Sequence, residues 1–185
     1  MSERVYMLGA ALLVAVQAFV LFLFGQPAIC TCGYVKLWEG VVLGAGNSQH
    51  LADWYSFSHI IHGILFYALI TYFFPKMSVW MRLLVATGIE AAWEILENTP
   101  MVINHYREQA LAQGYTGDSS INSISDTLMM MLGFILARKW AVWAVIALAL
   151  FLELWVAYEI RDNLTLNIMN LLHQFDFISA WQAGA

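Results

Sequence analysis

Residues 5–24, with the sequence VYMLGAALLVAVQAFVLFLF, decide the fold class of this chain. The run contains no charged residue, and it lies between Arg4 and the helix-ending Gly25-Gln26-Pro27. As a helix it is long enough to cross the hydrocarbon core of a bilayer, which is about 30 Å thick. Its length, together with Ile29 where a lipoprotein cleavage site needs a small residue, predicts an uncleaved membrane anchor rather than a signal peptide.

The composition of the whole chain is also typical of a membrane protein. Of its 185 residues, 61% are hydrophobic and only 11% are charged. Five spans of about 20 residues would leave too few residues for a separate soluble domain, so we expect a single membrane domain over residues 1–185. The net charge of −5, with the basic residues scattered singly, excludes nucleic acid as a partner.

The apolar pattern predicts an all-α fold, a polytopic helical bundle with five transmembrane helices. The expected spans are residues 5–24, 54–74, 79–97, 120–137 and 140–160. Two outer loops are expected, at residues 26–53 and 98–119. The C-terminal tail, residues 161–185, mixes leucines with asparagine and histidine, which predicts an interfacial or re-entrant helix.

Basic residues are shared unevenly between the two sides of this topology. Five lie on the side of the N-terminus, namely Arg4, Lys76, Arg82, Arg138 and Lys139, and three lie on the other side. The positive-inside rule therefore predicts a multi-pass membrane protein with a cytoplasmic N-terminus. In a bacterial cell the two long loops would then face the periplasm.

Acidic residues gather on the side opposite to the N-terminus. Twelve of the thirteen fall in outer loops or in the outer halves of spans, near the depth of two histidines. Residues three or four apart share a helix face, so each span should carry one polar stripe that faces the bundle interior. The three expected stripes are His59 with His62, then Glu90 with Glu94 and Glu97, and then Asp118 with Asn122 and Asp126.

Several carboxylates at one depth in a membrane must be neutralised, paired or bound to a cation, because each costs several kcal/mol in hydrocarbon. Histidine with carboxylates suits Zn²⁺ or Mn²⁺, and carboxylates with fewer histidines suit Ca²⁺ or Mg²⁺. We therefore predict a divalent metal site. Its candidate ligands are His59, His62, Glu94, Asp118 and Asp126, and the preferred set is His59, Glu94 and Asp126.

From this predicted metal site we expect a metal-dependent hydrolase or transferase that acts on a membrane lipid or a lipid-linked envelope molecule. Its predicted catalytic residues are Glu90 or Glu97, as the group that accepts a proton from water, and Asn122, which would orient the substrate. The alternative is a non-enzymatic accessory or assembly subunit of a larger membrane complex. In that case the polar groups hydrogen-bond helices to one another.

The outer loops carry weaker signals. Cys30 and Cys32 are two residues apart, which is a strained spacing for a bridge, so redox activity, metal binding and pairing with another chain stay open. The aromatic residues Trp38, Trp54 and Tyr55 are interpreted as anchors at the membrane interface. His50 is interpreted as a solvated loop residue.

Four motifs spread along the chain are Cys30-Thr31-Cys32-Gly33-Tyr34, Ser58-His59-Ile60-Ile61-His62-Gly63, Glu90-Ala91-Ala92-Trp93-Glu94 and Arg161-Asp162-Asn163. They resemble an uncharacterised family of small bacterial integral membrane proteins, a domain-of-unknown-function family. This resemblance implies a Gram-negative inner-membrane location and no particular activity. More distantly, His59, Glu94, Asp126 or Asn122, and Gly133 resemble the pattern of VanZ-like membrane proteins, which implies an envelope-related role.

Overall fold

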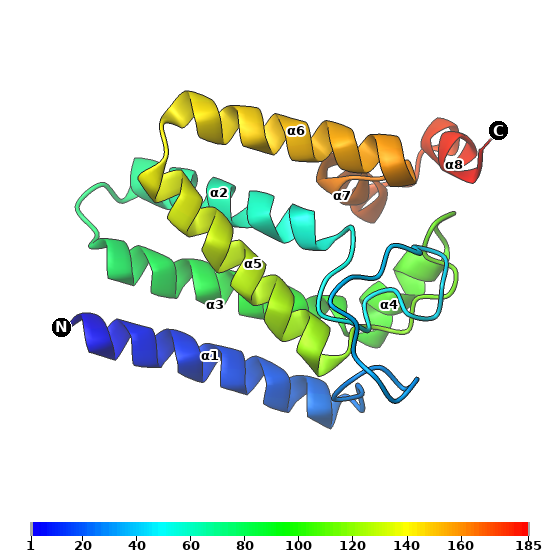
Figure 1. The fold of residues 1–185 in the computed structure, drawn as a ribbon, viewed down its shortest axis with the longest axis horizontal. Helices are drawn as coiled ribbons and strands as arrows, with labels where there is room; N and C mark the ends of the chain where they lie inside the picture. The colour runs from blue at the N-terminus through cyan, green and yellow to red at the C-terminus, as the bar shows by residue number, and fades with distance from the viewer. Residues whose placement is uncertain (1, 185) are drawn as a thin grey trace.

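The computed structural model describes residues 2–184, and all regular secondary structure in that range beyond one isolated bridge is helical. The eight helices are α1 (Glu3–Leu23), α2 (Ser56–Phe73), α3 (Val79–Glu97), α4 (Pro100–Arg107), α5 (Ser120–Lys139), α6 (Val142–Ile160), α7 (Leu164–Leu172) and α8 (Asp176–Ala183). In the same range the β pairing amounts to one isolated bridge, between Glu39 and Asp53. The prediction of an all-α bundle is confirmed. The axes of α1, α2, α3 and α6 are roughly aligned, with α2 running opposite to the others, and α5 lies obliquely across α2 and α3 (Figure 1).

Four helices are long and apolar enough to span a membrane, namely α1, α2, α5 and α6. The remaining predicted span, the third at residues 79–97, is a helix with those bounds, but it is not in this set. Arg82 and the three glutamates put at least three charged side chains into any 18-residue window of α3. The prediction of five spans is therefore wrong by this measure. The polar helix α3 instead packs against α1, α2 and α5.

The C-terminal tail also differs from the prediction. In place of one interfacial or re-entrant helix, the chain forms two short helices, α7 and α8. The connection into α7 has Arg161 in a left-handed backbone conformation, and Asn163 caps the helix by accepting a hydrogen bond from the Leu166 amide. Arg161 thus ends α6 and Asn163 starts a new helix, which the apolar pattern of the tail does not reveal.

Two glycines bring α2 and α5 into backbone contact. A Cβ atom at Gly63 would overlap the Met130 carbonyl oxygen, and one at Gly133 would overlap the Ile60 carbonyl oxygen. Close approach through glycine is common between membrane helices. It sets α2 and α5 side by side, and nearer the outer end Ser56 donates a hydrogen bond of 2.7 Å to Asp126.

A polar side chain in the first span joins three helices. Gln17 of α1 is fully buried, and its amide donates to the Ser123 hydroxyl at 2.7 Å and accepts from Thr127 at 2.9 Å. The Ser123 hydroxyl in turn donates to Glu94 of α3 at 2.7 Å. This chain of hydrogen bonds positions one carboxylate of the predicted site.

The loops and short helices gather at one end of the bundle (Figure 1). The two outer loops bind each other there, since the Gln49 side chain donates to the Gly117 carbonyl at 2.8 Å and the Ser119 amide donates to the Ser48 carbonyl at 2.9 Å. Cys30 and Cys32, whose redox state the sequence leaves open, form a disulfide. His50 is buried and accepts a hydrogen bond from the Lys36 amide, so its interpretation as a solvated residue is wrong.

Candidate metal and ligand site

The preferred ligand set of the sequence prediction comes together from three helices. His59 of α2, Glu94 of α3 and Asp126 of α5 are each at most 6% exposed, and one ligand atom from each lies within 4.8 Å of the other two. His59 Nδ1 lies 3.4 Å from Glu94 Oε1, and His59 Nε2 lies 3.9 Å from Asp126 Oδ2. These two distances involve opposite nitrogens of the His59 ring, and one ion takes only one of them. The grouping of donor atoms within 4.8 Å is the observation that matches a shared ion, since two tetrahedral ligands at about 2.0–2.1 Å from zinc are about 3.3 Å apart.

Glu90 contacts both histidines of α2. Its Oε1 atom lies 2.5 Å from His59 Nδ1, and its Oε2 atom lies 3.1 Å from His62 Nδ1. Glu90 is fully buried. A carboxylate on Nδ1 fixes the proton there and leaves Nε2 free as a metal ligand, which is how ligating histidines are usually oriented. The structure thus places Glu90 behind His59, on the side away from Asp126.

Two buried polar atoms of the site have no hydrogen-bond partner among the described residues. They are Oε1 of Glu94 and Nδ2 of Asn122, on side chains that are each 1% exposed. A buried unsatisfied polar atom costs about 1–3 kcal/mol, and more when it is charged. The other Glu94 oxygen is satisfied by Ser123. The free Oε1 atom is therefore the one that a cation would stabilise.

Asp118 lies beside the group of His59, Glu94 and Asp126 and is not one of its members. Its carboxylate accepts hydrogen bonds from the Asn98 side chain at 2.6 Å and from the Tyr115 hydroxyl at 2.9 Å. Burial raises the pKa of Asp118 to about 6, although both hydrogen bonds act in the opposite direction. With Glu94 and Glu97, Asp118 forms a second acidic group whose oxygens also lie within 4.8 Å of one another.

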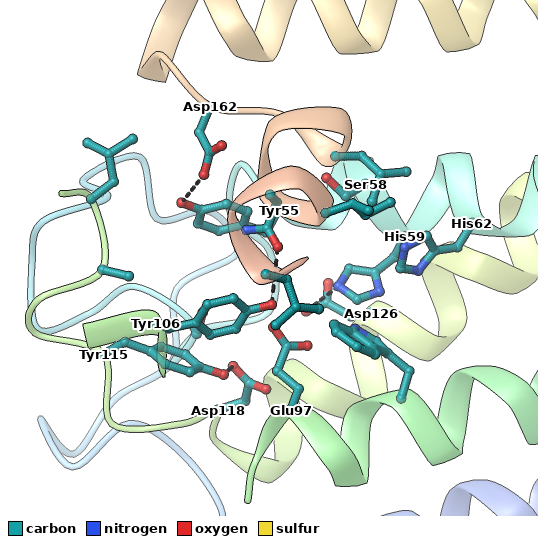
Figure 2. Close-up of a pocket in the computed structure, with 18 of the residues that line it drawn as sticks. Tyr55, Ser58, His59, His62, Glu97, Tyr106, Tyr115, Asp118, Asp126 and Asp162 are labelled. Atoms are coloured by element: carbon teal, nitrogen blue, oxygen red, sulfur yellow. Dashed lines mark hydrogen bonds and ion pairs between the residues drawn. The ribbon is translucent and has the colours of Figure 1, made fainter. Parts of the chain in front are cut away.

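A cavity of about 370 Å³ opens beside these residues. At one end it is lined by His59, His62 and Asp126, and at the other by Glu97, Asp118, Asp162 and three tyrosines, as Figure 2 shows. Apolar side chains of α2, α3 and α7 form much of the rest of its lining. Glu90, Glu94 and Asn122 do not line it.

Among the lining residues that the sequence did not predict for the site are Tyr55, Tyr106, Tyr115 and Asp162. Tyr55 donates to Asp162 at 3.2 Å, and Tyr106 donates to Asn167 of α7 at 3.1 Å. Burial raises the pKa of all three tyrosines well above the ordinary value. The composition of the loops offers only a generic interface role for tyrosine, and no spacing signal links these residues to the acidic stripes.

Comparison with known proteins gives a family match and close relatives. The family model described as "Protein of unknown function (DUF2585)" matches residues 21–184. A UPF0314 protein of Sphingopyxis alaskensis is 50% identical over 182 residues, covering 98% of this chain and 97% of that protein. A UPF0314 protein of Rhizobium meliloti is 52% identical over 180 residues, covering 97% and 91%. No solved structure matches the chain.

Proposed function

We propose that this chain, which belongs to the DUF2585 family of proteins of unknown function, is a membrane protein with a buried divalent-metal site built from His59, Glu94 and Asp126. The observation that carries the proposal is the unpartnered Oε1 atom of Glu94, which lies 3.4 Å from His59 inside a cluster of carboxylates. A cation there would satisfy the orphaned oxygen and offset part of the negative charge.

The donor set favours zinc or manganese, since it joins an imidazole nitrogen to carboxylate oxygens. Calcium and magnesium are the alternatives if water supplies further ligands. His62 and Asp118, also predicted as ligands, already have hydrogen-bond partners in Glu90, Asn98 and Tyr115. We therefore assign them to the surroundings of the ion.

We propose that the site serves a hydrolase or transferase that acts on a lipid or lipid-linked envelope molecule. A bound divalent ion would supply Lewis acidity toward an oxygen at the cavity end near His59 and Asp126. Glu97 lines the cavity and is only partly buried, so it is suited to accept a proton there. Glu90 is suited to orient His59, because its carboxylate is buried behind both histidines.

The location proposed for this activity is the periplasmic side of a bacterial inner membrane, with the N-terminus in the cytoplasm. The support is the distribution of basic residues together with the grouping of all long loops at the end of the bundle that carries the site. The distant resemblance to VanZ-like proteins stays a prediction.

One observation favours the second candidate, a non-enzymatic accessory or assembly subunit of a larger membrane complex. The chain of hydrogen bonds from Gln17 through Ser123 to Glu94 ties α1, α5 and α3 together. Such networks hold membrane helices in place without any catalytic role.

Metal analysis of the untagged protein in detergent separates the two candidates. After dialysis against mixed divalent ions, the wild type should retain about one equivalent of one metal. His59→Ala, Glu94→Gln and Asp126→Asn should lose it while they keep a sharp thermal transition. The matched control is His173→Ala, which removes an exposed histidine of the tail and should retain the metal. A wild type without metal, with all three variants merely less stable, would support the packing role.

A further inference from the structure

The apolar wall of the cavity lies where membrane lipid would meet the bundle. It is formed by Leu65, Phe66 and Leu69 of α2, Ile89 and Trp93 of α3, and Ile168 of α7. Leu65, Leu69 and Ile89 are between 45% and 51% exposed, although they line the cavity. Because α2 is a candidate span, this wall is open on the side where hydrocarbon chains pack. A chain can therefore enter from the bilayer without passing through water.

The polar end of the cavity is lined by acidic side chains and by no lysine or arginine. Three carboxylates line the end with the tyrosines, on Glu97, Asp118 and Asp162, and a fourth, on Asp126, lies at the other end. Charge repulsion disfavours an anionic group beside these carboxylates and favours a cation. Asp126 belongs to the proposed metal site, which leaves the other three carboxylates for a ligand.

The spacing of these carboxylates fits an ammonium group. The oxygens contributed by Glu97 and Asp118 lie within 4.8 Å of each other, and an ammonium can donate hydrogen bonds of about 2.8 Å to two such oxygens at once. The tyrosine hydroxyls donate to acceptors already, with Tyr115 bound to Asp118 and Tyr55 bound to Asp162. This leaves the ring faces to interact with a cation. Figure 2 shows these residues gathered at the end of the cavity away from His62.

We infer that the cavity binds a membrane lipid whose head group carries a protonated amine. The amine lies between Glu97, Asp118 and the tyrosines, and a hydrocarbon chain lies along Leu65, Leu69 and Ile89. The phosphate of such a lipid then falls between the amine and the apolar wall, near His59 and Asp126. The inference rests on the proposed function in one respect, since it names the substrate class of that site.

The test compares three lipids on the full-length protein in neutral detergent, with bound lipid counted by native mass spectrometry. Phosphatidylethanolamine carries the amine, its N-acetyl derivative keeps the phosphate and chains but lacks the cation, and phosphatidylglycerol is a natural anionic head group. We expect phosphatidylethanolamine to bind at least about tenfold more tightly than either of the others. Equal binding of phosphatidylethanolamine and its N-acetyl derivative, or a preference for phosphatidylglycerol, overturns the inference without any variant.

Two variants locate the amine. Glu97→Gln and Asp162→Asn should each reduce the preference for phosphatidylethanolamine over its N-acetyl derivative severalfold, and the control Glu159→Gln, at an exposed carboxylate of α6, should keep it. A preference that survives in both variants contradicts the assignment of the amine site. So does a second equivalent of metal in the wild type that Glu97→Gln removes, because the acidic group would then hold an ion.

Metal content measured on the same samples keeps the two proposals apart. Lipid selectivity without any metal would end the proposed metal site and leave the amine site standing. One equivalent of metal without lipid selectivity would do the reverse.

Discussion

Oε1 of Glu90 lies 2.5 Å from Nδ1 of His59, in the interior of the bundle. This contact selects which imidazole nitrogen is free for a metal ion. Glu90→Gln keeps an acceptor but removes the charge that raises the basicity of the imidazole, so we expect the metal affinity to fall by about 10- to 100-fold. Competition with a chromophoric chelator measures this change. An unchanged affinity would show that Glu90 does not act through His59.

The contact of α2 with α5 depends on two glycines that should tolerate no side chain. Alanine usually stabilises a helix relative to glycine by about 1 kcal/mol, but at Gly63 or Gly133 its Cβ would meet a backbone carbonyl of the other helix. We expect Gly63→Ala and Gly133→Ala each to lower the free energy of unfolding by about 1–3 kcal/mol, the usual cost of inserting an extra carbon atom into a well-packed core. Thermal unfolding in detergent measures the loss.

The matched control for the glycine variants is Gly114→Ala. A Cβ at Gly114 would meet open space, and its backbone is not in the left-handed region. This variant should unfold at the temperature of the wild type. If all three variants behave alike, the helices do not approach each other as closely as the structure has them.

Gln17 should contribute to stability more than to metal binding. Gln17→Leu leaves Ser123 and Thr127 without their α1 partner, which should cost about 1–3 kcal/mol. Ser123 can still donate to Glu94, so the metal content should persist. Thermal unfolding and metal analysis on one preparation check both statements, with Val16→Leu on the exposed face of α1 as the control. Loss of metal at unchanged stability would contradict the assignment.

The buried carboxyl of Asp162 should make the free energy of unfolding depend on pH. Burial raises the pKa of its carboxyl from 3.8 to about 6, and the side chain is 3% exposed. Between pH 3.8 and about 6 the unfolded chain loses this proton while the folded chain keeps it, so folding stability should fall as the pH rises through this window and level off above it. The difference of about 2.2 pKa units corresponds to at most about 3 kcal/mol.

The variant Asp162→Asn tests this prediction, because the amide carries no titrating proton. Its stability relative to the wild type should increase from pH 4 to pH 6.5, as measured by chemical unfolding in mild detergent. Parallel curves for the two proteins over that range would show that Asp162 is not the titrating group.

Depth and helical periodicity predict part of the candidate site, because residues three or four apart share a helix face. They indicate His59, Glu94 and Asp126, and the structure brings these three side chains together. Periodicity could not reveal what lies behind or beside them. Glu90 and Glu94 lie on the same polar stripe of α3, so the sequence does not distinguish their roles. Only the packing of α3 against α2 shows that Glu90 contacts both histidines.

The cavity could not be predicted for a related reason. Tyr55, Tyr106 and Asp162 are far apart in the chain and lie in loops and short helices, where no periodic pattern relates them. Tyr106 contacts Asn167 of α7, a helix that begins after the cap residue Asn163. The number of spans was overestimated because the stop signals around α3 define a helix without deciding whether its charged face can lie in a bilayer.

The position of a bound metal ion tests the central claim most directly. Crystals or lipid-phase crystals of the protein loaded with zinc should give one anomalous scattering peak at the zinc edge, about 2.0–2.2 Å from His59 Nε2 and from carboxylate oxygens of Glu94 and Asp126. A peak elsewhere, or no peak with those three side chains hydrogen-bonded only to one another, would contradict the account.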